Sequence, residues 1–371
     1  MRLAFVVYGS LAQVSGGFIY DRALVEALRA RGHAVDVVGL PWDGYLHAVA
    51  RNVVGLAMRR RPPPDLPAYD AVIHDELVHP SLFLFRRGAG PSPGGRLLLA
   101  LVHNLRSDQP AEPLRALKAA VERRYLSRVD GLLAVCAQTL ADVRALAGPA
   151  IPAAVIHPGR DHVAPDVDER FVEARAAEPG PLRVLHAAAV RPGKGLDRLL
   201  DALGLAAAQG AALTLDVVGS LAAAGYARRI EQQVARLGLV GRVRLHGERG
   251  GADLAAIFTR SQVLALPSDR EAYSLACLEA LGFGLPVLAT SQGGLPEMIR
   301  HGREGYLLDP RDRHGWADTL RRLADDRGTL AAMSRAALAR WRAHATWQEA
   351  ATAVERFIEA RLERPARAAS R

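Results

Sequence analysis

The sequence predicts an α/β protein built from two doubly wound domains, in which helices cover both faces of parallel sheets. The chain has 371 residues, enough for two domains at roughly 100–200 residues per domain. Short apolar runs alternate with longer amphipathic stretches, which is typical of parallel α/β sheets. The alternation breaks once, over 157–180, where proline, glycine and charge occur without periodicity. We interpret that segment as a linker between the domains.

The first series of elements opens with a wholly apolar strand at 3–8, which indicates a sheet buried on both faces. An amphipathic helix is expected at 18–31, with Gly32 as its C-cap. The other expected strands lie at 34–40, 71–74, 97–102, 131–135 and 153–156, and the other helices at 113–128 and 137–147. These elements predict a first domain over 1–165.

The second series has the same alternating character. Its expected strands lie at 183–188, 213–218, 242–246, 262–266 and 286–289, and its helices at 196–208, 222–237, 252–259 and 275–281. Three further helices are expected near 313–325, 329–342 and 347–363. The second domain is therefore predicted over 180–346. Two such domains place a ligand cleft between them, at the carboxyl ends of both sets of strands.

The charge of the chain says little about its partners. Lysine and arginine number 48 against 39 acidic residues, a net charge of +9. Only Lys118 and Lys194 are lysines, and the arginines are scattered along the chain. Aromatic residues make up 5%, too few for a base-stacking platform, so we expect no nucleic-acid partner.

Cysteine usage and hydropathy predict a cytoplasmic protein. Cys136 and Cys277 make neither a disulfide framework nor a metal-binding spacing. No apolar run reaches the roughly 18 residues that a membrane span needs. One predicted helix is basic and is compatible with peripheral contact at the inner membrane face, although its charges fan around more than one side: Arg115, Lys118, Arg123, Arg124 and Arg128. Nothing in the pattern indicates an oligomeric state.

Two carboxylates flank the start of the helix expected at 275–281. Glu271 precedes the helix, for which Ser274 is a good N-cap, and Glu279 lies eight residues further on. At about 1.5 Å per residue the two lie roughly 12 Å apart on nearly the same side. The helix start between them offers unpaired N–H groups to a phosphate. A nucleotide sugar matches this layout, but a solvated loop residue and a surface helix residue would give the same spacing.

The stretch LPSDREAYSLACLEA at 266–280, with GLPV at 284–287 and GGLPE at 293–297, resembles the Glu-x7-Glu signature of retaining glycosyltransferases of the family 4-like group. The resemblance extends from Arg2 to about Trp347. It implies the GT-B fold, two Rossmann-like domains facing across a cleft. It also implies that Glu271 contacts the transferred sugar and that Glu279 holds the ribose.

The resemblance further implies that backbone around Tyr273, Ser274 and Leu275 binds the donor diphosphate. Ala272-Tyr273-Ser274 stands where many members of the group have Gly-Phe-Gly. This departure predicts a sugar pocket that differs from that of the commoner members.

A second motif, AAAVRPGKG at 187–195, follows the first strand of the second domain. Lys194, between two glycines, is a point charge suited to a pyrophosphate. The segment is not a P-loop, because no serine or threonine follows the lysine. A surface lysine in a turn is the alternative. Members of the family generally carry an arginine where this chain has Ala189, and we expect Arg191 to replace it.

In the first domain, His103 follows the buried strand at 97–102, at the edge where the cleft is expected. The motif Val-His-Asn-Leu resembles a family motif whose histidine lies by the transferred sugar. A core histidine satisfied by backbone is the alternative. Gly16 and Gly17 in the first strand-to-helix loop would let backbone approach the donor phosphates.

Two further sets of residues complete the expected site. The acceptor side is expected at Tyr20, Asp21, Asp75, Glu76 and His79. The nucleobase, by the resemblance, is expected at Gly219, His246 and Gly247. Asp166 and Asp168 superficially resemble an Asp-x-Asp metal motif, but they lie in the expected linker, and we interpret them as solvated charge. No metal site is therefore expected.

The resemblance implies a retaining glycosyltransferase that moves a sugar from a nucleoside-diphosphate sugar to a hydroxyl acceptor without a separate cofactor. It also implies front-face substitution, with the departing diphosphate helping to deprotonate the acceptor, and a C-terminal helix, 347–371, that completes the first domain. Two alternatives stay open. A sugar-nucleotide epimerase shares the architecture, and a basic, non-enzymatic binder of nucleic acid or membrane surfaces would account for the charge.

Overall fold

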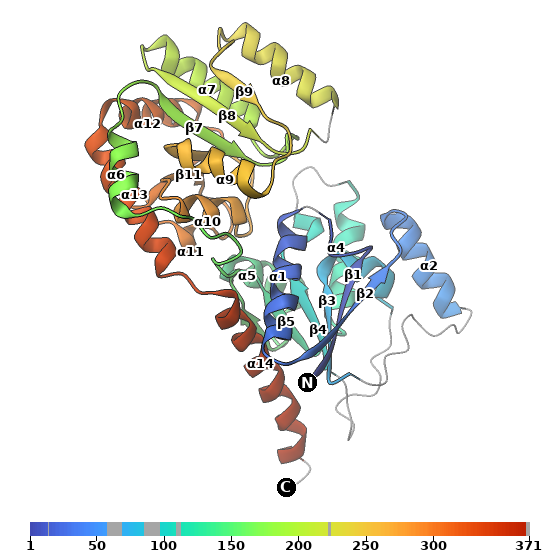
Figure 1. Cartoon of the computed structure of the whole chain (residues 1–371). Coiled ribbons are helices and arrows are strands. Elements are labelled where there is room, and N and C mark those ends of the chain that lie inside the picture. The colour runs from blue at the N-terminus through green and yellow to red at the C-terminus, as the bar shows by residue number, and fades with distance from the viewer. Residues whose placement is uncertain (14, 58–68, 85–96, 109–112, 222–223, 369–371) are drawn as a thin grey trace. The chain divides into compact units, whose positions relative to one another are not determined.

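The computed structural model describes residues 1–13, 15–57, 69–84, 97–108, 113–221 and 224–368. The chain forms two compact units: Met1–His162 with Ala345–Arg371, and Val163–His344. Each unit is a parallel sheet with helices on both faces (Figure 1). The C-terminal helix α14 (Trp347–Ala368) belongs to the first unit.

The first unit is built on a six-stranded sheet in the order β2-β1-β3-β4-β5-β6. Its strands are β1 (Arg2–Tyr8), β2 (Ala34–Leu40), β3 (Ala71–Asp75), β4 (Leu97–Val102), β5 (Gly131–Ala134) and β6 (Ala153–Val155). Leu3 pairs with Val35 on one side and with Ala71 on the other, so β1 is an interior strand. Its apolar run is fully buried, as the sequence predicts for a sheet covered on both faces.

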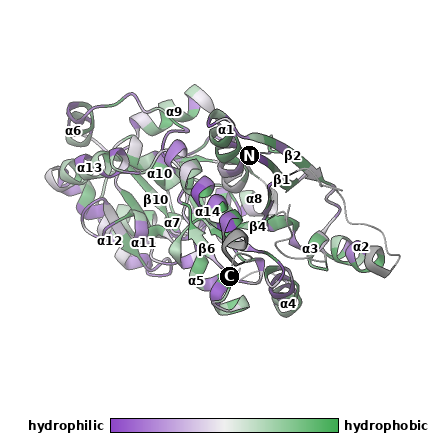
Figure 2. Ribbon diagram, turned by 90° about the horizontal axis from the view of Figure 1, so that it is seen from below, coloured by the Kyte–Doolittle hydropathy of each residue, from purple (hydrophilic) through white to green (hydrophobic). Residues whose placement is uncertain are grey.

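Helices and short 3-10 turns follow the strands of the first unit: α1 (Gly16–Ala30), α2 (Tyr45–Ala57), η1 (Glu76–Val78), α3 (His79–Leu82), η2 (Arg106–Asp108), α4 (Arg115–Leu126) and α5 (Ala137–Ala147). Helix α14 packs against α1. Val354 and Ile358 on α14 are fully buried, and Arg31 forms an ion pair with Glu355. Figure 2 shows both hydrophilic and hydrophobic residues on α14, as expected for a helix that buries one face.

The second unit is a six-stranded sheet in the order β12-β11-β10-β7-β8-β9. Its strands are β7 (Leu182–Ala187), β8 (Leu213–Val218), β9 (Val243–Leu245), β10 (Val263–Leu266), β11 (Val287–Thr290) and β12 (Gly305–Leu308). Its helices are α6 (Glu169–Ala177), α7 (Leu196–Ala208), α8 (Ala224–Arg236), α9 (Gly251–Arg260), α10 (Leu275–Gly282), α11 (Leu295–Met298), α12 (Arg313–Asp325) and α13 (Arg327–Arg342).

Every strand and helix expected from the sequence is present, and each begins within two residues of its expected start. The 13-residue helix α2 and the short elements η1, α3, η2, α11 and β12 were not expected. Several of these run for only three or four residues, too few to show a period of 3.6 or 2.

The prediction that 157–180 is an irregular linker is wrong over 169–177, where the chain forms α6. Asp168, expected to be solvated charge, is the N-cap of this helix and accepts a hydrogen bond from the N–H of Phe171 at 2.7 Å. Arg175 is buried and donates to the carbonyl groups of Thr259 and Gly284. Because a buried arginine takes a core position of this short helix, its apolar periodicity is too weak to be recognised.

Each sheet reverses its strand order once. In the first unit β2 and β3 lie on opposite sides of β1, and in the second β8 and β10 lie on opposite sides of β7. Ligands of open α/β sheets bind outside the carboxyl ends of the strands at such a reversal. A ligand-binding site is therefore expected at the loops after β1 and β3 and at those after β7 and β10. Among the described residues no helix combines the length and apolar character that crossing a membrane demands.

Candidate functional site

The loops after β7 and β10 bring Lys194 and Glu271 together at the strand-order reversal of the second unit. Nζ of Lys194 donates to Oε1 of Glu271 at 2.7 Å. The lysine side chain is 23% exposed and the glutamate side chain 9% exposed. The ion pair is therefore largely buried, with the lysine as its more exposed member. Two separate motifs of the sequence thus contribute to one site, which we call the Lys194–Glu271 site.

Close backbone contacts hold these two loops together. Gly195 has φ of +76°, and a β-carbon there would lie 1.9 Å from the carbonyl oxygen of Pro267, so only glycine fits. The N–H of Asp269 donates to the carbonyl of Gly193 at 2.9 Å. Arg198, from the first turn of α7, donates to Oδ1 of Asp269 at 2.7 Å and to the carbonyl of Pro267 at 2.8 Å.

Neither Arg198 nor Asp269 is predicted as a site residue from the sequence. Asp269 stands two residues before Glu271, but a lone aspartate after a strand is usually solvated. Its role depends on a partner 71 positions away, which no local pattern indicates.

Backbone of the GGLPE motif holds Glu271 from the other side. The N–H of Glu271 donates to the carbonyl of Gln292, and its own carbonyl accepts from the N–H of Gly294 at 3.0 Å. Gly293 has φ of +102°, and a β-carbon there would lie 1.8 Å from the carbonyl oxygen of Glu271. Gly293 is therefore needed for this close approach, which fixes the place of the glutamate.

Opposing effects set the ionisation of Glu271. Burial by itself would raise its pKa, but the charge and hydrogen bond of Lys194, with smaller contributions from Ser268 and Arg191, lower the pKa below its ordinary value. Glu271 is thus held as a carboxylate. Arg191 is exposed in the same loop as Lys194, close enough to influence Glu271.

The start of α10 has an unusual backbone. Ser274, its N-cap, has φ of +63° and ψ of +97°, in the region that favours glycine. Its Oγ accepts from the N–H of Cys277, and its carbonyl accepts from the N–H of Leu278. The N–H groups of Leu275 and Ala276 have no intrahelical acceptor, because they belong to the first turn.

The residues around that helix start differ in accessibility. Tyr273 is buried, Leu275 and Glu279 are partly exposed, and Cys277 is fully buried. Burial raises the pKa of the Cys277 thiol to about 12, so it is not a nucleophile at neutral pH.

The three residues expected at a nucleobase lie at the ends of β8 and β9. The N–H of Gly219 donates to the carbonyl of Gly247 at 3.0 Å. A β-carbon on Gly219 would lie 2.0 Å from the carbonyl oxygen of Ala188, in the loop that leads to Lys194. Nε2 of His246 lies 2.6 Å from Oδ1 of Asp216, so this ring is already engaged by the sheet.

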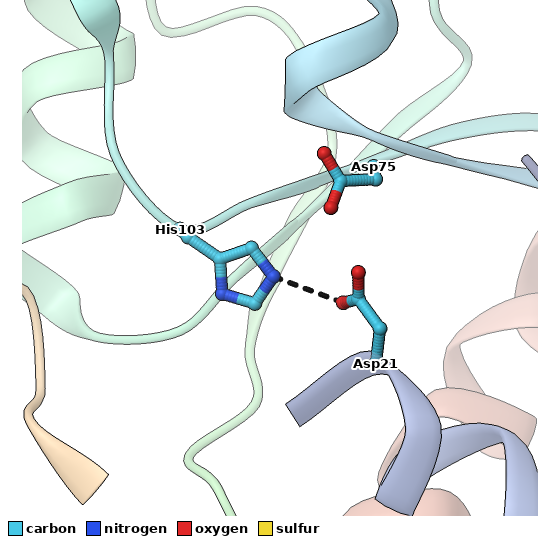
Figure 3. Close-up of side chains that lie close together, drawn as sticks. All are labelled: Asp21, Asp75 and His103. Atoms are coloured by element: carbon cyan, nitrogen blue, oxygen red, sulfur yellow. Dashed lines mark hydrogen bonds and ion pairs between the residues drawn. The ribbon is translucent and has the colours of Figure 1, made fainter. Parts of the chain in front are cut away.

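In the first unit, four residues form a cluster at the carboxyl ends of β3 and β4 and on α1: Asp21, Asp75, Glu76 and His103, the acid–histidine cluster. Oδ1 of Asp21 lies 2.9 Å from Nε2 of His103, and Figure 3 shows the carboxylate of Asp75 beside that of Asp21. Oε2 of Glu76 accepts from the backbone N–H of His103 at 3.1 Å. The side chain of His103 is 12% exposed and that of Asp21 is fully buried.

Burial governs the acids of this cluster. It raises the pKa of Asp21 to about 8 and that of Glu76 to about 8, and it raises the pKa of Asp75 well above its ordinary value. The charge of each acid on its neighbours adds to the effect for Asp75 and Glu76. Asp75 also caps η1, accepting from the N–H of Leu77 at 2.6 Å.

The remaining residues expected on the acceptor side are buried as well. Tyr20 donates from its hydroxyl to the carbonyl of Ile156 at 2.8 Å. His79 contacts the carbonyl of Glu76 through Nδ1 and the hydroxyl of Tyr45 through Nε2, and burial lowers its pKa to about 4. None of the five expected acceptor-side residues exposes more than 9% of its surface. Their role toward an acceptor stays a prediction.

Gly16 and Gly17 open α1, whose N-cap is Ser15. A β-carbon on Gly17 would lie 3.6 Å from Cδ2 of His103, so the glycine borders the histidine ring. Asp21, Asp75 and His103 each offer a possible metal-ligating atom, and these atoms lie within 4.8 Å of one another.

Comparison with known proteins agrees with this architecture. The family model described as glycosyl transferases group 1 matches residues 167–340, and the model described as glycosyltransferase family 4 matches residues 14–163. Curated relatives include D-inositol 3-phosphate glycosyltransferases of Streptomyces avermitilis, 40% identical over 124 residues, and Corynebacterium glutamicum, 36% identical over 119 residues. These matches cover 33% and 32% of this chain but only 26% and 28% of the relatives.

Solved structures resemble the whole chain at low identity. A sucrose-phosphate synthase from Thermosynechococcus elongatus has a TM-score of 0.77 at 21% identity, with 99% of each chain covered. Anabaena HepE in complex with UDP and glucose has a TM-score of 0.76 at 19% identity, covering 97% of this chain and 100% of that one. WaaG, a glycosyltransferase involved in lipopolysaccharide biosynthesis, has a TM-score of 0.70 at 18% identity, covering 96% and 99%.

Two Rossmann-like units, each with its polar residues at the strand-order reversal, define a protein of the GT-B class. The two family models together span most of the chain, one on each unit. The chain belongs to the group 1 glycosyl transferases, with a family 4 N-terminal unit.

Proposed function

We propose that the protein is a retaining glycosyltransferase that moves a sugar from a nucleoside-diphosphate sugar to a hydroxyl acceptor, with no separate cofactor. The observation that carries the proposal is the Lys194–Glu271 site, placed beside the start of α10 at the strand-order reversal. A cation, helix N–H groups and a buried carboxylate suit a diphosphate joined to a hydroxyl-rich sugar.

In this reaction the bond between the anomeric carbon and the diphosphate oxygen breaks, and the acceptor oxygen bonds to the same face of that carbon. The acceptor proton passes to the departing diphosphate. Lys194, Arg191 and the N–H groups at the start of α10 stabilise the negative charge on the leaving group. Glu271 and His103 orient the sugar, and Glu279 holds the ribose.

The names of the related proteins indicate which ligands to test first. The matched relatives are D-inositol 3-phosphate glycosyltransferases, and structures of HepE hold UDP, glucose or UDP-glucose. We therefore propose UDP and UDP-sugars as probes of the donor site and polyhydroxylated alcohols, including phosphorylated ones, as acceptors.

Calorimetric titration with UDP tests the role of Lys194 in binding the diphosphate of the sugar donor. We expect Lys194→Ala to weaken UDP binding by about tenfold or more, since a charge-assisted hydrogen bond contributes about 1.5–3 kcal/mol. Arg335→Ala is the matched control, because Arg335 is an exposed cation of the same unit, paired with Glu173 on α6. Unchanged UDP affinity in Lys194→Ala would contradict the phosphate-binding role.

The anomeric configuration of the first product, followed by NMR, tests the stereochemistry. Retention is expected, and an inverted product excludes the proposed mechanism. Incubation with UDP-sugar, with and without acceptor, separates transfer from epimerisation, because an epimerase isomerises the sugar without acceptor whereas a transferase leaves the sugar unisomerised and releases nucleotide when the acceptor is added.

A further inference from the structure

Helix α2, which follows the edge strand β2, leaves an apolar stripe exposed (Figure 1). Leu46, Val53 and Val54 lie at positions i, i+7 and i+8 and therefore share one side of the helix. The exposed side of a helix is usually polar, because apolar surface in water is unfavourable. An exposed apolar stripe at helical spacing therefore indicates a surface that meets a partner.

The opposite side of α2 is already used for packing against α3. Ala48 is fully buried. The side chain of Asn52 donates to the carbonyl of Ser81 at 2.6 Å and accepts from the N–H of Leu84 at 2.9 Å. These contacts fix the rotation of the helix about its axis, so the apolar stripe faces outward.

The start of α4 continues this surface. Nζ of Lys118 lies 5.1 Å from the ring centroid of Tyr45, the first residue of α2, so the two helix starts are neighbours. Leu114 and Leu117, at the start of α4, are both exposed.

Trp42, just before α2, is exposed as well. Its ring packs on that of Tyr8 at the end of β1, with 4.6 Å between centroids, and the guanidinium of Arg106 lies 5.9 Å from it. We call the following six side chains, which are 40–54% exposed, the apolar surface: Trp42, Leu46, Val53, Val54, Leu114 and Leu117. They are six of the ten large apolar side chains that are exposed among the described residues, so exposed apolar area is concentrated here.

Positive charge predominates on the same segments. The described charges there include three arginines against two aspartates: Arg51, Arg106, Arg115, Asp43 and Asp108. From position 45 to position 61 the sequence holds four arginines and no acidic residue, and three of these arginines follow the described part of α2. Arginines beside exposed leucine, valine and tryptophan match an anionic membrane, in which phosphates lie above acyl chains.

A second copy of the chain fits this surface less well. A stable interface takes about 20–30 residues a side, against six exposed apolar side chains here. A twofold dimer would also bring the same basic surface against itself.

We propose that the first unit docks on an anionic lipid membrane through the apolar surface, with its apolar side chains among the acyl chains and the neighbouring arginines at the lipid phosphates. The proposal does not depend on the proposed function. It differs from attachment through the basic residues of α4, because Lys118 is buried and Arg123 donates to the carbonyl of Leu146.

Cosedimentation of the full-length protein with phosphatidylcholine vesicles, with and without about 30% phosphatidylglycerol, tests the docking. We expect binding to the anionic vesicles to be at least about tenfold tighter than to the neutral ones. Absence of binding, or equal binding to both kinds of vesicle, overturns the proposal.

Substitution of the stripe tests where the membrane binds. The double variant Leu46→Gln with Val53→Gln should bind anionic vesicles at least about tenfold more weakly, because two apolar side chains no longer leave water. The matched control makes the same two changes at exposed positions of the second unit, Leu221→Gln with Val240→Gln, and should bind as the wild type does. All four positions are exposed, so we expect unchanged circular dichroism spectra. Equal binding by the two double variants overturns the assignment of the surface.

Tryptophan fluorescence provides a second readout of the same contact. Of the four tryptophans, Trp42 alone is exposed. We expect the emission to shift to shorter wavelength when anionic vesicles are added, and the shift to be absent in Trp42→Phe. Vesicle binding without a change in emission overturns the proposal.

Sedimentation velocity tests the second copy as the occupant. We expect the wild type and the variant Leu46→Gln with Val53→Gln to have the same oligomeric state. A wild-type oligomer that dissociates in this variant assigns the apolar surface to a second copy and overturns the proposal.

Discussion

Ser274 has the backbone conformation of a glycine but carries a side chain. Its φ of +63° falls where many relatives, by the resemblance of the motif, have glycine. The hydroxyl compensates in part, because Oγ accepts from the N–H of Cys277 at the start of α10. The residue therefore combines a strained backbone with a useful cap at the point where the proposed diphosphate binds.

Substitution of Ser274 separates these two effects. Ser274→Ala should lower the free energy of unfolding by about 1 kcal/mol, because it removes the cap and keeps the strain. Ser274→Gly should be neutral or stabilising by up to about 1 kcal/mol, because relief of the left-handed conformation offsets the lost cap. Urea unfolding of both variants measures this order. A glycine variant less stable than the alanine variant would contradict it.

The ionised state of Glu271 depends on Lys194, whose charge and hydrogen bond lower the pKa of the glutamate. Lys194→Met leaves a buried carboxylate without its cation, and we expect a loss of about 1–3 kcal/mol at pH 7.5, below the usual cost of breaking a fully buried pair because the lysine is partly exposed. The pKa of Glu271 then rises through burial, so acidification to pH 5 should reduce the deficit. The double variant Lys194→Met with Glu271→Gln is the control and should recover stability. A deficit that is constant with pH would contradict this account.

Helix α14 shows how an element far along the chain completes an early domain. It follows the second unit in sequence, yet packs on α1 and buries Trp347, Val354 and Ile358 in the first unit. The Phe357 ring lies so close to Gly131 that a β-carbon there would be 2.8 Å from it. The sheet of the first unit thus depends on a segment more than 200 residues away from β5.

Truncation at the buried face of α14 should therefore destabilise the first unit. We expect Ile358→Ala to lower the free energy of unfolding by about 2–4 kcal/mol, since the side chain is fully buried. Glu359→Ala, at the adjacent exposed position, should change it by less than about 0.5 kcal/mol. Thermal unfolding of both variants provides the comparison, and equal effects would mean that α14 contributes little to this unit.

The helices and strands differ in how clearly the local sequence pattern predicts them. Interior strands such as β1 and β10 are continuous apolar runs, and helices such as α7 repeat leucine at helical spacing, so both are recognised locally. Helix α6 is not, because Arg175 occupies one of its core positions and is satisfied only by carbonyl groups of distant segments. A buried charge with distant partners has no local signature.

At the scale of the whole molecule, buried titratable groups predict how stability responds to pH. Burial lowers the pKa of His79 and His186 to about 4 and that of His74 to about 3, so these histidines contribute stability above pH 6.5 that is lost as the pH falls toward 4. The acids Asp21 and Glu76 have the opposite effect on how stability depends on pH. Their pKa values are raised to about 8, so their contribution decreases as the pH rises through 8.

Between pH 6.5 and 8.5 the acids Asp21 and Glu76 lose protons that the folded state retains, and we expect the melting temperature to fall across this range. Each proton that the folded state retains changes the free energy of unfolding by about 1.4 kcal/mol per pH unit. Glu76→Gln should flatten this decline, because the amide does not ionise, whereas Glu173→Gln on the exposed face of α6 should leave it unchanged. A melting temperature that rises from pH 6.5 to 8.5 would exclude this arrangement of protons.

Local patterns in the sequence predict a two-domain α/β protein, because apolar runs and helical periodicity are local, and they single out Lys194, Glu271 and His103 as candidate site residues, because each follows a recognisable strand. Which loops meet depends on how the strands are ordered in the folded sheets. The reversal of strand order next to β7 joins Gly193 and Lys194 to Asp269 and Glu271, and the contact of Asp21 with His103 brings α1 to the residue that follows β4. Strand order and depth of burial arise from packing between distant segments, so no spacing along the chain reveals them.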